Sequence, residues 1–373
     1  MALPGILRIL CEKGGLIVQK RLILCLLVVC VLLSGCGNLF DGHYSSVKPH
    51  EQQPNSSTSQ NVSASNYGQL SAALVKFVQT GREKGVINVE VYNQAVVEAD
   101  MKRAITDVMH HNAIAAYAVD TVSFELGKSR GKPALDVEIA YTHNRAEILK
   151  IKKVYDVAGA IKIISGALNQ CQTDIVLQIG RYEQTDFAQV VESYALENPQ
   201  YVMEVPQVTV NVYPETGTTR VVELRFTYQT SRDSLRNMQE RVQPVFESAA
   251  LYVSGDGPDA EKFAQLYSFL MERYDYKYET SMTPAYSLLR HGVGDSRAFA
   301  VVYAAMCRQA GLKCLVVSGT KAGESHYWNI VCDDGVCYHV DLLEGEFRKR
   351  TDDQMAGFVW DYSAYPACGK RSG

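Results

Sequence analysis

The sequence predicts an α+β protein in which two similar small modules precede a third mixed domain. Three observations support this prediction: alternating apolar residues mark short strands, apolar residues at helical spacing mark helices, and matched elements of the two modules recur at a constant distance. The chain has 373 residues, of which 47% are hydrophobic and 21% charged, and this is enough for two or three globular domains.

The first segment, residues 1–35, has the pattern of a targeting signal and is left out of the fold. Lys20-Arg21 precedes an apolar run, Leu22–Leu33, which is shorter than the roughly 20 residues of a spanning helix. The run ends in Leu33-Ser34-Gly35-Cys36, which resembles a bacterial lipobox with Cys36 as the lipid-bearing residue. We therefore expect a lipoprotein anchored in the bilayer through Cys36, on the outer face of the bacterial cytoplasmic membrane. An ordinary signal peptide with a chance cysteine is the alternative.

The charge balance and the next segment agree with that location. The whole chain has a formal net charge of −4, and removing residues 1–35, which carry a net +3, leaves about −7. So acidic a protein is not expected to bind nucleic acid. Residues 36–67 are rich in Ser, Asn and Gln and poor in large apolar residues, so they are predicted to be a disordered tether.

The two modules are assigned to residues 68–168 and 169–254, each with the order β-α-β-β-α. The first has elements near 87–92, 99–111, 121–126, 135–141 and from 145 on; the second has them near 175–179, 186–196, 208–213, 221–228 and from 232 on. Thr121 and Val208, Tyr141 and Tyr228, and Arg145 and Arg232 are each 87 residues apart. This constant spacing predicts a duplicated unit.

The last domain, residues 255–373, begins after a Gly-Asp-Gly-Pro turn. A helix is predicted over 260–274 and another over 297–309, the second with one buried stripe and a stop at Gly311. Asp334-Gly335 is a two-residue hairpin turn signal, and counting across it pairs Trp328 with Asp341. His326 is then a diagonal neighbour of Asp341, within reach of a hydrogen bond.

Three side chains of this domain have the order of a nucleophile, a base and a residue that orients the base. Ser296 opens the helix, His326 lies at the start of a strand, and Asp341 lies on the next strand. A helix N-terminus lowers the pKa of a thiol, whereas a hydroxyl gains much less and needs a base to remove its proton.

The segments Gly294–Ala300, His326–Asn329 and His339–Asp341 resemble the transglutaminase-like domains of bacteria, a papain-like group whose nucleophile is a cysteine. Here Ser296 stands at the position of that cysteine. The resemblance covers about Phe263 to Cys368 and implies a papain-like transglutaminase core at the C-terminus. Trp328, Tyr327 and Tyr276 are candidate walls of its cleft, with packing in the core as the alternative.

The cysteines that remain after signal removal lack the paired CxxC spacing of a zinc site, so neither a metal nor a cofactor is expected. Cys332 and Cys337 are directly opposite each other in the predicted hairpin. The sequence leaves two alternatives for them, a cross-strand disulfide or two free thiols. Cys307 and Cys314 bracket a turn and could also form a bridge.

Three interpretations of function remain. In the first, the domain has lost its chemistry and binds a peptide or cell-wall fragment without cutting it. In the second, Ser296, His326 and Asp341 form a working hydrolase or acyltransferase triad. In the third, the chain is an envelope scaffold and Ser296 is only a helix N-cap.

Overall fold

The computed structural model describes residues 62–253, 255–278 and 281–370. The predicted signal at 1–35, the predicted lipidation site Cys36 and the part of the predicted tether before residue 62 lie outside the described residues. No helix within the described ranges is both long enough and apolar enough to cross a bilayer.

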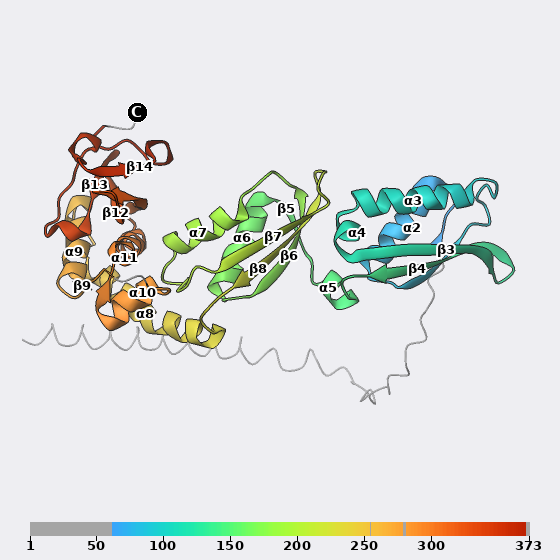
Figure 1. Cartoon of the computed structure of the whole chain (residues 1–373), viewed down its shortest axis with the longest axis horizontal. Coiled ribbons are helices and arrows are strands. Elements are labelled where there is room, and N and C mark those ends of the chain that lie inside the picture. Colours follow the sequence, from blue (N-terminus) through green and yellow to red (C-terminus); the bar gives the residue numbers. More distant parts are fainter. Residues whose placement is uncertain (1–61, 254, 279–280, 371–373) are drawn as a thin grey trace, which may run out of the picture. The chain divides into compact units, whose positions relative to one another are not determined.

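The first sheet has the strand order β1-β2-β4-β3. Helices α2 and α3 pack on one face of it, and α4 follows α3 (Figure 1). The bounds are β1 (Val62–Ser63), α2 (Tyr67–Gln79), β2 (Lys84–Asn88), α3 (Val97–His111), α4 (Ala113–Ala118), β3 (Val119–Ser129) and β4 (Lys132–Tyr141). Its core holds fully buried side chains from both layers, including Phe77, Met101 and Leu135.

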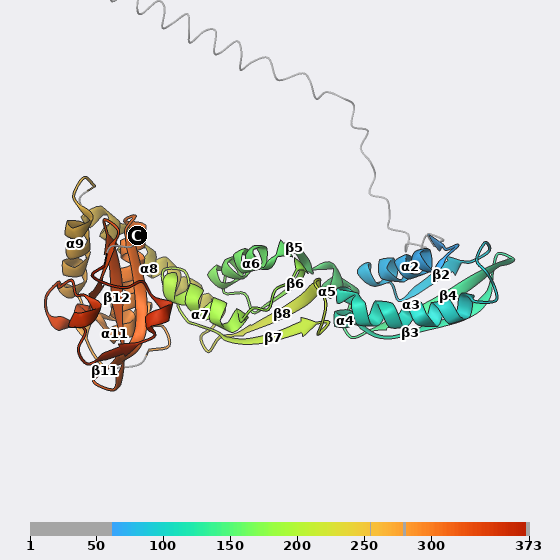
Figure 2. The same cartoon turned by 90° about the horizontal axis from the view of Figure 1, so that it is seen from above.

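The second sheet repeats this strand order as β5-β6-β8-β7, with α6 and α7 packed on one face (Figures 1 and 2). The bounds are β5 (Lys152–Asp156), α6 (Val157–Asn169), β6 (Asp174–Arg181), α7 (Phe187–Glu197), β7 (Gln207–Tyr213) and β8 (Arg220–Thr227). In each sheet the first strand runs parallel to the second and the remaining pairs are antiparallel. Duplication of one ancestral unit remains a prediction.

Each sheet contains an initial strand and helix that the sequence analysis did not assign to it. Strand β1 lies inside the predicted tether, residues 36–67, yet it pairs with β2 and the following Ala64 is completely buried. Strand β5 and helix α6 lie inside the range predicted for the first module, but β5 pairs with β6 of the second sheet. The helix predicted from Arg145 is the short α5 (Arg145–Leu149), because the chain turns into β5 soon afterwards.

The strand predicted over residues 87–92 is also wrong in its bounds, since β2 ends at Asn88. The side chain of Asn88 accepts a hydrogen bond from the amide of Glu90 at 2.9 Å. The amide of Tyr92 then donates to the carbonyl of Val89 at 3.0 Å. An asparagine that bonds its own backbone in this way favours a turn over continued pairing.

The C-terminal region is built around one helix, α11 (Ser296–Gln309), which packs against a four-stranded sheet on one side and against other helices on the other (Figure 2). The sheet has the order β13-β12-β11-β14. Its strands are β11 (Lys313–Lys321), β12 (Glu324–Asp333), β13 (Val336–Val340) and β14 (Phe358–Trp360), and the helices are α8 (Arg232–Tyr252), α9 (Asp259–Met271) and α10 (Pro284–His291).

The sequence analysis predicted one buried stripe on this helix, but the helix is buried on more than that face. Every residue from Ala298 to Cys307 is buried, because layers lie on both sides of α11. A helix that is apolar on all faces belongs in the interior of a domain. The start of α11, and with it Ser296, is therefore held in one position.

Gly319 of β11 permits a close approach of three strands. It is opposite His326 on β12 and opposite Trp360 on β14. A side-chain carbon at Gly319 would lie 2.7 Å from the ring of Trp328 and would clash with the carbonyl oxygen of Val359. Neither the buried ring nor the strand backbone has room to move.

We predict that Gly319→Ala destabilises this sheet by about 1–3 kcal/mol, the usual cost of overpacking. The measurement is urea unfolding followed by tryptophan fluorescence, since both tryptophans of the chain, Trp328 and Trp360, lie in this sheet. Gly166→Ala in α6 is the control, because an added methyl there meets no atom within 4 Å. Unfolding of Gly319→Ala at the wild-type urea concentration would contradict the prediction.

Candidate active site

Ser296 is the first residue of α11 and follows a short parallel pair, β9 (Asp275–Tyr276) with β10 (Val293–Gly294). Asp295 caps the helix, and its carboxylate accepts a hydrogen bond from the amide of Ala298 at 2.9 Å. The N-cap role that the scaffold interpretation gave to Ser296 is therefore wrong, because Asp295 fills it.

The hydroxyl of Ser296 lies against strand β12. Its Oγ accepts a hydrogen bond from the amide of Tyr327 at 3.2 Å, and only 8% of the residue is exposed. Tyr327 follows His326 directly, so the hydroxyl is brought next to the strand that carries the imidazole. No hydrogen bond joins Ser296 to His326 in the part of the chain that the structure describes.

His326 and Asp341 are brought together by the β12–β13 hairpin. The ladder pairs Cys332 with Cys337 and continues to Asn329 with Val340, in the register that the Asp334-Gly335 turn predicts. Nε2 of His326 lies 3.0 Å from Oδ2 of Asp341, and both residues are buried. The imidazole nitrogen left for a nucleophile is thus Nδ1.

Asp341 is held as a carboxylate by its donors. Its Oδ1 accepts from the amide of Leu343 at 3.1 Å. Burial opposes ionisation, but hydrogen bonds from His326 and Lys321 outweigh it, and the pKa of Asp341 is lowered from its ordinary value. A charged Asp341 fixes the ring orientation of His326.

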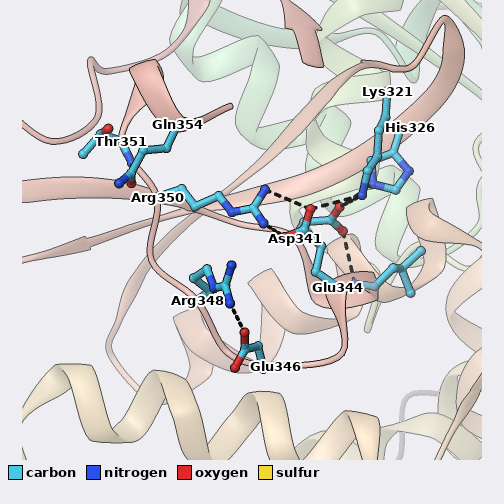
Figure 3. Close-up of polar contacts among 10 residues, drawn as sticks. Lys321, His326, Asp341, Glu344, Glu346, Arg348, Arg350, Thr351 and Gln354 are labelled. Carbon is cyan, nitrogen blue, oxygen red and sulfur yellow. Dashed lines mark hydrogen bonds and ion pairs between the residues drawn. The ribbon is translucent and has the colours of Figure 1, made fainter. Parts of the chain in front are cut away.

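Sequence reasoning missed a set of charged residues around this carboxylate, which Figure 3 shows with their contacts. Nζ of Lys321 lies 2.8 Å from Oδ2 of Asp341 and 3.2 Å from Oε1 of Glu344. Arg350 in turn donates to Glu344 at 2.9 Å. A signal for Lys321 was available: the Ala322-Gly323 turn pairs Lys321 with Glu324, and strand alternation then places Lys321 on the same face as His326.

Comparison with known proteins identifies this region. The family model described as the transglutaminase-like superfamily matches residues 247–342, a range that contains Ser296, His326 and Asp341. The C-terminal region contains a transglutaminase-like domain. The predicted fold class is confirmed: a mixed α and β chain with a papain-like, transglutaminase-like domain at its C-terminal end.

Solved structures of related type align only distantly. A crystal structure titled as that of a TGase aligns at 9% identity over 66% of this chain and 69% of that chain, with a TM-score of 0.27. EGTA-treated LapG of Legionella pneumophila aligns at 13% identity over 36% of this chain and 73% of that chain, with a TM-score of 0.25. A comparison with curated proteins gave no match. The assignment of the transglutaminase-like domain therefore depends on the family model.

The three predicted cleft walls of the transglutaminase-like domain differ in their placement. Trp328 is completely buried, so the alternative of core packing holds for it and its assignment as a cleft wall is wrong. Its ring packs in edge contact on Phe358 and Trp360, with centroids 5.1 and 5.8 Å away. Tyr276 is 50% exposed, and Tyr327 is partly buried under the guanidinium of Arg297. These two remain candidates for contact with a ligand.

The cysteine alternatives are also resolved. Cys332 and Cys337 form a disulfide across the β12–β13 hairpin. The bridge suggested between Cys307 and Cys314 is absent: both are free, buried thiols among the described residues.

One group of side chains in the domain has the composition of a metal site. Ligand atoms of His339, Asp352 and Cys368 all lie within 4.8 Å of one another. The indole N–H of Trp328 donates to Nδ1 of His339 at 2.9 Å, so Nδ1 carries no proton, and Nε2–H of the neutral ring donates to Asp352 at 2.9 Å. Burial, followed by the charge of Asp352, raises the pKa of Cys368 to about 12. A metal ion at this group would have to displace both protons, because metal ligands are deprotonated.

A cavity of about 430 Å³ lies beside the start of α11. Its lining combines polar and apolar residues of α10, β10 and the segment that follows β9, and includes Gly294, Asp295, His291, Ser287 and Met282. Gly294 and Asp295 precede Ser296 directly in the chain, but Ser296, His326 and Asp341 are not among the residues that line the cavity.

We predict that His339 makes the stability of this domain depend on pH. Burial lowers the pKa of His339 below its ordinary value, although Asp352 opposes this, so the folded state holds the ring neutral. A group of this kind contributes stability above the unfolded pKa, near 6.5, and loses it as pH falls below that value. The wild type should lose up to about 1.4 kcal/mol per pH unit from this group below pH 6.5.

Urea unfolding at pH 7.5 and pH 5.0 compares the wild type with His339→Gln, whose amide can bond both Trp328 and Asp352 but does not titrate. The variant should be less stable at pH 7.5 and lose less stability on acidification. Equal losses in the two proteins would show that His339 is not the responsible group.

Proposed function

We propose that the transglutaminase-like domain binds peptide-containing material of the bacterial envelope without turning it over. Cys36 carries lipid and tethers the folded part to the outer face of the cytoplasmic membrane. The polar segment that follows Cys36 and the acidic charge of the chain support an extracytoplasmic role with no nucleic-acid partner.

The state of Ser296 is the observation that carries the loss of turnover. A hydroxyl ionises far above neutral pH and needs a base in hydrogen-bond contact to become a nucleophile. The oxygen of Ser296 instead accepts a hydrogen bond from the amide of Tyr327, and it makes none with His326. A site shaped for a large, polarisable sulfur also places a smaller oxygen at the wrong distance for attack.

The cavity beside the start of α11 supports binding of a ligand. Its volume of about 430 Å³ and its mixed lining suit a peptide side chain or a cell-wall fragment rather than a large cofactor. The half-exposed Tyr276 adds an aromatic surface nearby, since its backbone pairs with Gly294, which lines the cavity. Retention of the chain on purified peptidoglycan fragments tests this part of the proposal, and absence of retention favours the envelope scaffold.

A second candidate function is a serine hydrolase or acyltransferase. The contact of 3.0 Å between His326 and Asp341 favours it, because an oriented imidazole is what such a triad requires. The two functions differ in whether His326 ever removes the proton of Ser296.

We predict that wild-type protein is not labelled by a fluorophosphonate probe, whereas Ser296→Cys acquires a low thiol-dependent amidase or crosslinking activity. A sulfur at the start of α11 would have the helix N-terminus and His326 to assist its ionisation. The measurements are gel fluorescence of the labelled protein and amide release from peptide substrates.

His326→Ala, combined with Ser296→Cys, is the control and should abolish the gained activity. Labelling of wild-type Ser296 that disappears in His326→Ala would establish the hydrolase and refute the loss of turnover.

We also predict that Cys36→Ala releases the protein from the membrane fraction into the medium, because the lipid is then lost. Immunoblots of fractionated cells measure the distribution. Cys30→Ala, which removes a cysteine from the apolar run of the signal, is the matched control and should leave the protein bound. Unchanged retention of Cys36→Ala would exclude the lipid anchor.

A further inference from the structure

Lys321 lies at the end of β11 and reaches the buried carboxylate of the site. Its backbone pairs with Glu324, and Gly319 pairs with His326, so Lys321 and His326 project from the same face of the sheet. Its Nζ lies 2.8 Å from Oδ2 of Asp341 (Figure 3). This is the same oxygen that Nε2 of His326 contacts at 3.0 Å.

One carboxylate oxygen therefore serves two nitrogen donors. The two contacts of 2.8 and 3.0 Å bring the ammonium and the imidazole within roughly 6 Å of each other. The other oxygen of Asp341 is taken by the amide of Leu343. A neutral imidazole tolerates this arrangement, but an imidazolium there would face a fixed positive charge at short range.

The remaining groups around His326 do not remove this effect. Oε1 of Glu344 also accepts a hydrogen bond from the ammonium of Lys321 at 3.2 Å, but Arg350 in turn donates to Glu344. Among the described residues, the imidazole also makes ring contacts with Trp328 and Phe358. On its own strand, the exposed Glu324 lies two residues away.

Lys321 itself is held in its charged form. Burial lowers the pKa of an ammonium, but the hydrogen bonds and charges of Asp341 and Glu344 outweigh it and raise the pKa of Lys321 above its ordinary value. The charge of Lys321 then cancels that of Asp341, and the charge of Arg350 cancels that of Glu344. Little net negative charge is left to stabilise a cation at His326.

We infer that Lys321 is a positioning residue that shares Oδ2 of Asp341 with His326, and that it is a second cause, beside Ser296, of the loss of turnover at this site. A thiol at position 296 reaches its reactive state by passing its proton to Nδ1 of His326, which creates a thiolate and an imidazolium. Lys321 opposes that ion pair. The inference deepens the proposed loss of turnover and rests on it.

The test measures how fast iodoacetamide, an uncharged reagent, alkylates the thiol introduced by Ser296→Cys between pH 5 and pH 9. Wild-type protein supplies the background from the other cysteines. Adding Lys321→Met to Ser296→Cys should increase the rate at pH 6 about tenfold. Adding Lys321→Arg, which keeps the charge, should leave the rate near that of Ser296→Cys alone.

Lys349→Met is the matched control for loss of a lysine that pairs with a carboxylate of the same sheet. Lys349 contacts Asp333 at 2.7 Å, at the end of β12 farthest from His326, so its removal should not change the rate. A rate with Lys321→Met that equals the rate with Ser296→Cys alone, or falls below it, overturns the inference. An equal increase with Lys321→Arg also overturns it.

A second variant covers the case in which Lys321→Met fails to fold. Glu344→Gln leaves the ammonium of Lys321 to Asp341 alone, so the thiol of Ser296→Cys should then react several-fold more slowly at pH 6. An unchanged or faster rate contradicts the inference. Failure of the proposed function has a separate readout, since it requires fluorophosphonate labelling of wild-type Ser296.

Discussion

The buried carboxylate of Asp341 is the charge on which the arrangement of this site depends. Only 1% of its side chain is exposed, and an unpaired carboxylate at such a place would be very costly. Its donors come from three elements: Lys321 at the end of β11, His326 on β12, and the amide of Leu343 in the 3₁₀ turn η2 (Leu342–Glu344). Because all three donors bind the two oxygens of Asp341, they fix the β11–β12 hairpin, the β12–β13 hairpin and the turn η2 relative to one another.

The helix that carries Ser296 imposes a different constraint. Because α11 is enclosed between a sheet and other helices, the position of its first residue does not adjust to the atom it carries. An oxygen placed there keeps the location of the nucleophile but not its chemistry, since its proton is held far more tightly than that of a thiol. In the proposed function, the transglutaminase-like domain thus retains an oriented imidazole and a cavity without turnover.

A second pair of histidine and carboxylate, His339 and Asp352, is connected to the site through Trp328. Trp328 donates to His339, His339 donates to Asp352, and the amide of Cys368 donates to the other oxygen of Asp352 at 3.0 Å. This chain of hydrogen bonds fastens the closing segment of the domain to β13. It also fixes the indole whose plane lies within 22° of the imidazole of His326. Both histidines are held by carboxylates, but only His326 lies near the helix N-terminus.

The sequence by itself determined the local features of this protein. The turn at Asp334-Gly335 set the hairpin register, and that register was enough to bring His326 to Asp341. Short-range patterns also located most strands and helices. Tertiary structure decided what depends on distant partners: the pairing of β1 and β5 in their sheets, the complete burial of Trp328, and the ion pair of Lys321 with Asp341. The reason is physical, since periodicity describes which face of a segment is apolar but not which charge or layer will cover that face.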